Sequence, residues 1–107
     1  MKIRFTNDLL KELYDALPVG KKNALPGKEI RQMFGFDTLR DCKKAIATLR
    51  ENGAPICADV SNTGGYFKPE NVDEAIEYLK VTKVRIASER RALKAIENYC
   101  REGGEVK

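Results

Sequence analysis

The sequence predicts a mainly α-helical fold with a small β-hairpin and a long C-terminal helix. Apolar residues recur at helical spacing in three segments before residue 53, and proline or glycine separates these segments. Residues that favour β-structure then flank a polar, glycine-rich stretch at 61–65. The final stretch, 70–102, contains neither proline nor glycine, so nothing in it interrupts a helix.

The first helix is expected to begin after Thr6 or Asn7, because a short polar side chain can accept hydrogen bonds from the free N–H groups of a first turn. Pro18 and Gly20 end it. Its apolar residues lie on one helical face and are Leu9, Leu10, Leu13, Tyr14 and Leu17. A basic loop at 21–23 follows, and Ala24-Leu25 can form a very short strand.

The second helix is predicted to open at Pro26-Gly27, since the first turn of a helix requires no N–H from proline. Gly35 closes this helix by adopting a left-handed conformation. The buried side of this region is expected to consist of Leu25, Ile30, Met33 and Phe34.

The third helix is expected to follow a cap at Asp37 or Thr38 and to run to about Asn52, where Asn52-Gly53 is a strong stop signal. Its apolar stripe consists of Leu39, Cys42, Ala45, Ile46 and Leu49.

A hairpin is predicted between about Pro55 and Lys68, with strands at 54–60 and 66–69. In the first strand Ile56, Ala58 and Val60 alternate with Cys57 and Asp59. Because successive side chains of a strand point to opposite faces, one face is expected to pack on the helices.

The last helix is expected to begin at Glu70 or Asn71 and to extend to Glu102, a length of roughly 50 Å at 1.5 Å per residue. This length exceeds the width of a compact 69-residue domain, so we divide the chain into a domain at 1–69 and a helical segment at 70–107. Only the first part of the helix, Val72 to Leu79, is expected to pack back on that domain.

Apolar residues recur every seven positions along this helix, at Val72, Leu79, Ile86, Leu93 and Cys100. Such a repeat favours a seam between helices. A helix packed wholly on its own domain is the alternative, but we favour a homodimer. The expected dimer contacts are Leu79, Ile86, Leu93, Ile96 and Cys100.

Several functional classes find no support in the composition. The chain has no histidine, and its three cysteines are widely spaced, which argues against zinc sites and against Ser-His-Asp or Cys-His catalysis. We expect no enzyme activity, no metal, no cofactor and no small-molecule ligand. No apolar run approaches the roughly 20 residues that span a bilayer, and no signal peptide is evident, so a cytoplasmic protein without a membrane partner is expected.

Two helices joined by a tight turn and followed by a hairpin are the element order of a winged helix-turn-helix. An α-helix fits the major groove of B-DNA, and a hairpin can contact the backbone beside it. The net charge of +4 by itself says little about nucleic acid, but the distribution of the basic residues and the element order make double-stranded DNA the expected partner. Base-reading candidates on the third helix are Thr38, Arg40, Lys43, Lys44 and Thr48. Phosphate and wing candidates are Lys21, Lys22, Lys28, Asn62, Thr63 and Lys68.

Residues 25–67 resemble the N-terminal helix-turn-helix domain of biotin operon repressors, and still more the small phage and prophage proteins that carry this domain. The matching segments are Leu25-Pro26-Gly27-Lys28-Glu29-Ile30, Leu49-Arg50-Glu51-Asn52-Gly53, Pro55-Ile56 and Gly64-Gly65-Tyr66. The resemblance implies a winged helix that controls transcription of phage or prophage genes in a bacterial cytoplasm. No ligase segment follows, so it implies no biotin chemistry.

Two other functions remain open. The same module serves in phage replication and excision as an accessory DNA-binding protein. Alternatively, the third helix and the hairpin could contact a protein, because the basic residues of this helix are interspersed with Asp37, Asp41 and Glu51. In that case the present chain would be an adaptor that binds a protein and does not bind DNA.

Overall fold

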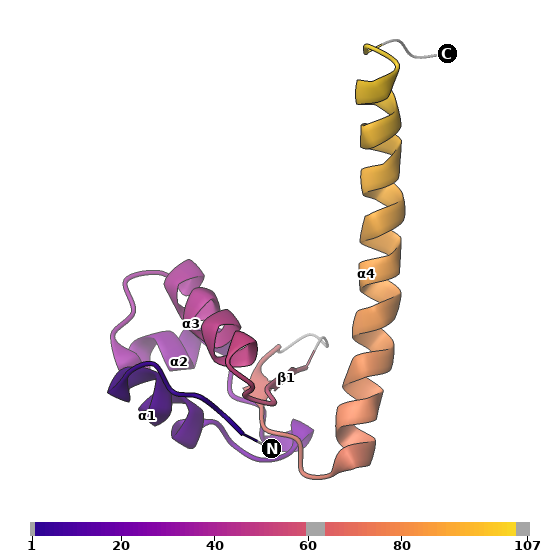
Figure 1. Ribbon diagram of the computed structural model, residues 1–107. Coiled ribbons are helices and arrows are strands. Elements are labelled where there is room, and N and C mark those ends of the chain that lie inside the picture. The colour runs from indigo at the N-terminus through magenta and orange to yellow at the C-terminus, as the bar shows by residue number, and fades with distance from the viewer. Residues whose placement is uncertain (1, 60–63, 105–107) are drawn as a thin grey trace. The chain divides into compact units, whose positions relative to one another are not determined.

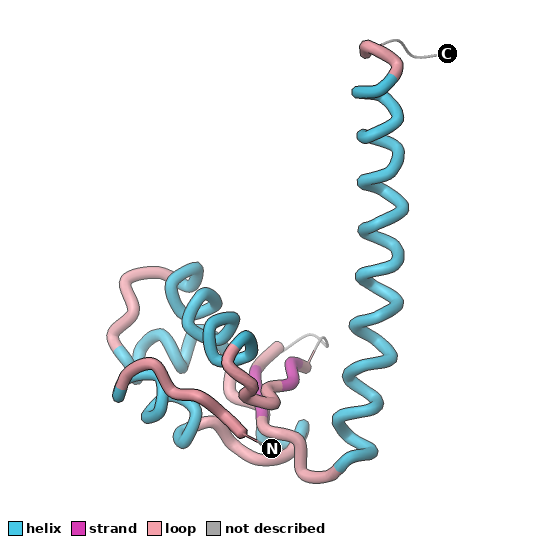
Figure 2. Tube along the Cα trace, viewed as in Figure 1, coloured by secondary structure: helices cyan, strands magenta, loops and turns pink. Residues whose placement is uncertain are grey.

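The computed structural model describes residues 2–59 and 64–104. Within them the chain is mainly helical, with a small antiparallel hairpin and a long C-terminal helix, as predicted (Figures 1 and 2). The chain divides into two compact units, Met1–Ala75 and Ile76–Lys107. The elements in order are α1 (Asp8–Ala16), the 3-10 turn η1 (Lys21–Asn23), α2 (Gly27–Phe34), α3 (Leu39–Glu51), β1 (Cys57–Ala58), β2 (Tyr66–Phe67) and α4 (Val72–Arg101).

Short polar side chains cap three of the helices. Asn7 Oδ1 accepts from the Leu10 N–H at 2.8 Å, and Thr38 Oγ1 accepts from the Asp41 N–H at 3.1 Å. Asn71 Oδ1 accepts from the Glu74 N–H at 2.9 Å, at the start of α4. Each bond satisfies a donor that a first helical turn leaves free. Of the alternatives that the sequence left open, Asn7, Thr38 and Asn71 are therefore the caps.

The core of the first unit lies between α1, α2, α3 and the root of the hairpin. Its helices pack through the predicted apolar stripes, and Phe67 of β2 is the largest of the fully buried side chains. The buried core cluster consists of Leu10, Leu13, Leu17, Ile30, Cys42, Ile46, Leu49, Ala54 and Ile56.

Three residues predicted to be buried are exposed. Leu9 is 43% exposed and Met33 is 59% exposed. Each is adjacent to a residue that points inward, and a step of about 100° per residue turns the neighbour toward solvent. Leu39 is 44% exposed because it lies in the first turn of α3, where it lines a surface hollow rather than the core.

β2 has pairing partners on both sides. It pairs antiparallel with β1 in the register Cys57↔Phe67 and Ala58↔Tyr66. On its other side Tyr66 exchanges two hydrogen bonds of 2.9 Å with Leu25. This pairing agrees with the short strand predicted at Ala24-Leu25. This pairing joins the segment before α2 to the hairpin.

The strands are shorter than predicted, and the expected alternation of β1 is wrong. Ile56 and Cys57 are consecutive, yet they are only 4% and 5% exposed. Ile56 belongs to the core cluster, as predicted; the departure is at Cys57, which was expected on the opposite face and is buried too, while Ala58 is only half-buried. Val60, which the prediction placed on the buried face, lies outside the described residues.

α4 is a continuous helix (Figure 1). None of its residues is buried. Val72, which was predicted to pack inward, is 72% exposed. The first turn is held by polar contacts instead: Glu74 Oε1 accepts from the Lys21 N–H at 3.1 Å and from the Glu70 N–H at 3.2 Å. Within the described residues, no helix is long and apolar enough to cross a membrane.

Candidate nucleic-acid interface

One face of α3 is open to solvent and carries three cations. Cys42, Ile46 and Leu49 are buried, and they direct the opposite side of the helix outward. At about 100° per residue this outer side carries Arg40, Lys43, Lys44 and the small Ala47, all of which are exposed. Three of the five predicted base-reading residues therefore share one surface.

The other two predicted base-reading residues form hydrogen bonds within α3. Thr38 uses its side-chain oxygen as the N-cap of the helix. Thr48 is half-buried, and its hydroxyl donates to the Lys44 carbonyl at 3.0 Å. Both threonines therefore shape the helix that carries the cations.

Arg31 fixes the turn that leads into α3. Its Nε donates to the Phe36 carbonyl at 3.1 Å, and its Nη2 donates to the Asp37 carbonyl at 2.7 Å. Gly35 adopts the left-handed conformation at φ +68, as the sequence predicts for the end of α2. Arg31 was not among the predicted site residues, although a cation in the last turn of a helix is a known partner for free carbonyl groups.

A hollow of about 350 Å³ lies where α2 begins, beside α3 and the hairpin. It brings Lys28 and Lys43 to one surface, together with the exposed Leu39 and the ring of Tyr66. Asp59 contributes a carboxylate to the same lining. The full lining is Pro26, Gly27, Lys28, Leu39, Lys43, Ala58, Asp59, Gly64, Gly65 and Tyr66.

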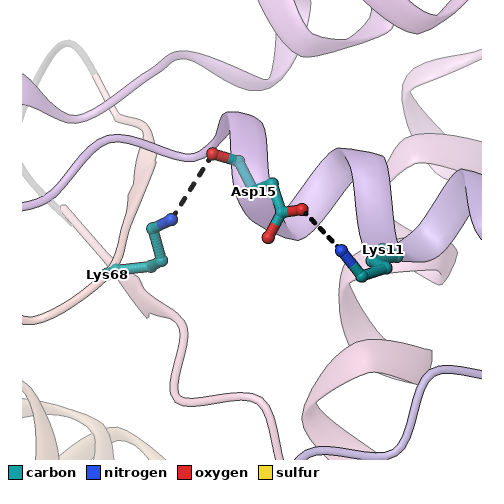
Figure 3. A network of polar contacts seen from close by, with 3 residues as sticks. All are labelled: Lys11, Asp15 and Lys68. Atoms are coloured by element: carbon teal, nitrogen blue, oxygen red, sulfur yellow. Dashed lines mark hydrogen bonds and ion pairs between the residues drawn. The ribbon is translucent and has the colours of Figure 1, made fainter.

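Lys68 lies against α1 rather than in the hollow. Its Nζ lies 3.5 Å from the Asp15 carbonyl oxygen (Figure 3). The same Nζ is 4.9 Å from the centre of the Tyr14 ring. The Asp15 carboxylate in turn pairs with Lys11 Nζ at 3.2 Å. The ammonium group of Lys68 is thus engaged within the fold.

Two further phosphate candidates, Lys21 and Lys22, do not line the hollow. Lys21 and Lys22 lie in η1 with exposed side chains, and the backbone N–H of Lys21 donates to Glu74. Asn62 and Thr63 lie outside the described residues. Of the four phosphate candidates that the structure describes, Lys28 is thus the one that lines the hollow with Lys43.

The two buried thiols are uncharged at neutral pH. Burial raises the pKa of Cys42 above its usual value, although nearby Lys43 opposes this shift. Burial also raises the pKa of Cys57; Glu74 adds to the shift and Arg50 opposes it. Since the thiolate is the nucleophilic form, these residues act as packing groups. Across residues 2–59 and 64–104, no three His, Cys, Asp or Glu residues gather where they could hold a metal ion.

Comparisons with protein-family models, with curated proteins and with solved structures found no match. This surface carries more cations than carboxylates, because Glu51 and Asp59 lie among four lysine and arginine residues. Arg40, Lys43 and Lys44 lie on α3, and Lys28 lies beside them at the start of α2. A ligand that fits it carries regularly spaced negative charges and hydrogen-bond acceptors.

Proposed function

We propose that the protein binds double-stranded DNA as a winged helix-turn-helix, with α3 in the major groove. The observation that supports this most strongly is the open face of α3, where Arg40, Lys43 and Lys44 project beside a hollow that contains Lys28. The order of α1, α2, a tight turn, α3 and a hairpin fits this mode of binding.

Each cation has a distinct role in this proposal. Arg40 can place two donors on a guanine edge, and Lys43 and Lys44 can reach base acceptors or phosphates. Ala47 leaves room for the helix to approach the groove closely. Lys28 contacts a phosphate, because it lies in the first turn of α2, where free N–H groups also favour an anion. From the family resemblance we infer a use in the control of phage or prophage transcription.

Fluorescence anisotropy with a mixed-sequence duplex at about 50 mM and about 200 mM salt tests the proposal. Binding is expected to weaken steeply with salt, because each neutralised phosphate releases counterions. No binding at the lower salt concentration would overturn the proposal and favour a protein-binding adaptor.

Arg40→Ala and Lys43→Ala are each expected to weaken binding to a selected target site by about 1–3 kcal/mol if they read bases. Lys11→Ala is the matched control, because Lys11 is an exposed cation on α1 whose partner is Asp15. Equal losses for the control and the α3 variants would show that net charge alone governs binding.

We also propose that the apolar stripe of α4 pairs with a second copy of the chain. Leu79, Ile86, Leu93 and Ile96 are 49%, 44%, 56% and 61% exposed, and Cys100 at the end of the stripe is exposed too. Apolar side chains repeated every seven residues are stabilised when a second helix covers them. A symmetric dimer would present two copies of α3 to a palindromic site.

Analytical ultracentrifugation of Ile86→Asp/Leu93→Asp tests this pairing. The double variant is expected to sediment as a monomer at concentrations where the wild type is a dimer, because two buried carboxylates per helix would lack partners. Val81→Asp/Ser88→Asp is the matched control, since it adds the same charges at the same spacing on another side of α4 and should remain dimeric. Identical profiles for all three proteins would reject the seam.

A further inference from the structure

α4 carries a second cationic surface, separate from its apolar stripe. At about 100° per residue, every lysine and arginine from 80 to 101 except Arg85 falls within a sector of about 100° around the helix axis. Between these positions the same sector contains Ala87 and Asn98, and no carboxylate. We call this surface the α4 basic face; it consists of Lys80, Lys83, Arg90, Arg91, Lys94 and Arg101.

The cations of this face are exposed and available to a ligand. All six are exposed, and no ion pair of theirs is found within the described residues. Arg85, the cation outside the sector, does have a partner: its Nε lies 3.9 Å from Glu89 Oε1. Arg85 is thus paired and lies outside the sector, whereas the six cations within the sector have no acidic residue between them.

We propose that the α4 basic face contacts the phosphate backbone of duplex DNA. The face extends over about 21 residues, or roughly 32 Å, which matches about nine base pairs of duplex at 3.4 Å each. Long cationic side chains along one straight helix can follow phosphates without reading bases. The inference rests on the proposed function for the identity of the ligand, but it assigns a different surface and a sequence-independent role.

Two features favour DNA over an anionic membrane as the ligand. A helix that lies in a membrane surface buries its apolar side, but here that side contains Thr82 and Glu89, so a carboxylate would enter the hydrocarbon boundary. The chain also contains no tryptophan, the residue that commonly anchors such helices at the interface. Phosphate contact needs only the cations.

The basic face is also compatible with pairing of α4. On a helical wheel its centre lies about 90° from the centre of the stripe formed by Leu79, Ile86 and Leu93. A second helix on the stripe therefore leaves most of the basic face open. Pairing would bring two such faces to one assembly and increase its attraction for a polyanion.

The test compares Lys83→Gln/Arg90→Gln/Lys94→Gln with a control of equal charge, Lys2→Gln/Lys11→Gln/Arg85→Gln. Affinity for a mixed-sequence duplex of about three helical turns is measured from about 50 to about 200 mM salt, and sedimentation confirms the same association state for each protein. For the basic-face variant we expect the slope of log K against log salt to fall by about 2 to 3, with affinity about 10-fold to 100-fold weaker at the lower salt. The control is expected to retain most of the wild-type slope.

The outcomes separate this inference from the proposed function. If Arg40→Ala weakens binding but the basic-face variant behaves as its control does, the inference is wrong and the proposed function stands. If the basic-face variant loses binding while Arg40→Ala and Lys43→Ala do not, the inference stands and the role of α3 is wrong. A wild-type protein that binds no duplex, or whose basic face is needed only for binding anionic phospholipid vesicles, overturns the inference.

Discussion

Replacing Phe67 with alanine is expected to lower the free energy of unfolding by about 3–5 kcal/mol. Phe67 is the largest fully buried side chain, with 2% exposure. It lies on β2, where its backbone pairs with that of Cys57, another buried residue. Small domains have only about 5–15 kcal/mol of stability, so this single change should remove a large share of the stability of the first unit. Urea unfolding followed by circular dichroism measures the loss.

Two variants separate the cavity from general effects of substitution. Phe67→Leu keeps most of the apolar volume and should lose clearly less stability than Phe67→Ala. Met33→Ala removes an apolar side chain that is 59% exposed, and it should change stability by no more than about 0.5 kcal/mol. Similar losses at Phe67 and Met33 would contradict the placement of Phe67 in the core.

Gly53→Ala is expected to lower the free energy of unfolding by about 2–4 kcal/mol, more than an ordinary glycine substitution. The backbone of Gly53 has φ +95, a conformation that residues other than glycine rarely adopt. A Cβ at this position would also lie 2.7 Å from the backbone oxygen of Lys2, so the N-terminal segment would have to move. That segment is bound nearby, since the Arg4 N–H donates to the Asn52 carbonyl at 2.9 Å.

Gly35→Ala is the matched control for this prediction. Gly35 has φ +68, but nothing lies within 4 Å of the position that its Cβ would take. Alanine there should cost only the conformational energy of the left-handed region, about 1–2 kcal/mol. Thermal unfolding of both variants should therefore show a larger drop in Tm for Gly53→Ala, and equal drops would show that the contact with Lys2 has no energetic effect.

Much of the candidate DNA surface follows from the pattern of α3. The buried positions of Cys42, Ile46 and Leu49 imply that Arg40 and Lys44 face outward, and helical geometry carries this inference without knowledge of the rest of the fold. The position of Lys68 could not be inferred in this way. Its interaction with Tyr14 and Asp15 depends on how the end of β2 packs on α1, and these residues are more than 50 positions apart in sequence.

The sequence by itself determined the kind, order and approximate ends of the helices. Side-chain caps such as Asn7 and Thr38, glycine stops and apolar spacing act within a few residues, so they can be recognised locally. Only the tertiary structure showed that Leu39 is exposed, that Leu25 pairs with β2, and that Lys28 and Lys43 share one hollow. These features depend on contacts between segments distant in sequence, where packing determines which side of a helix or strand remains open to a partner.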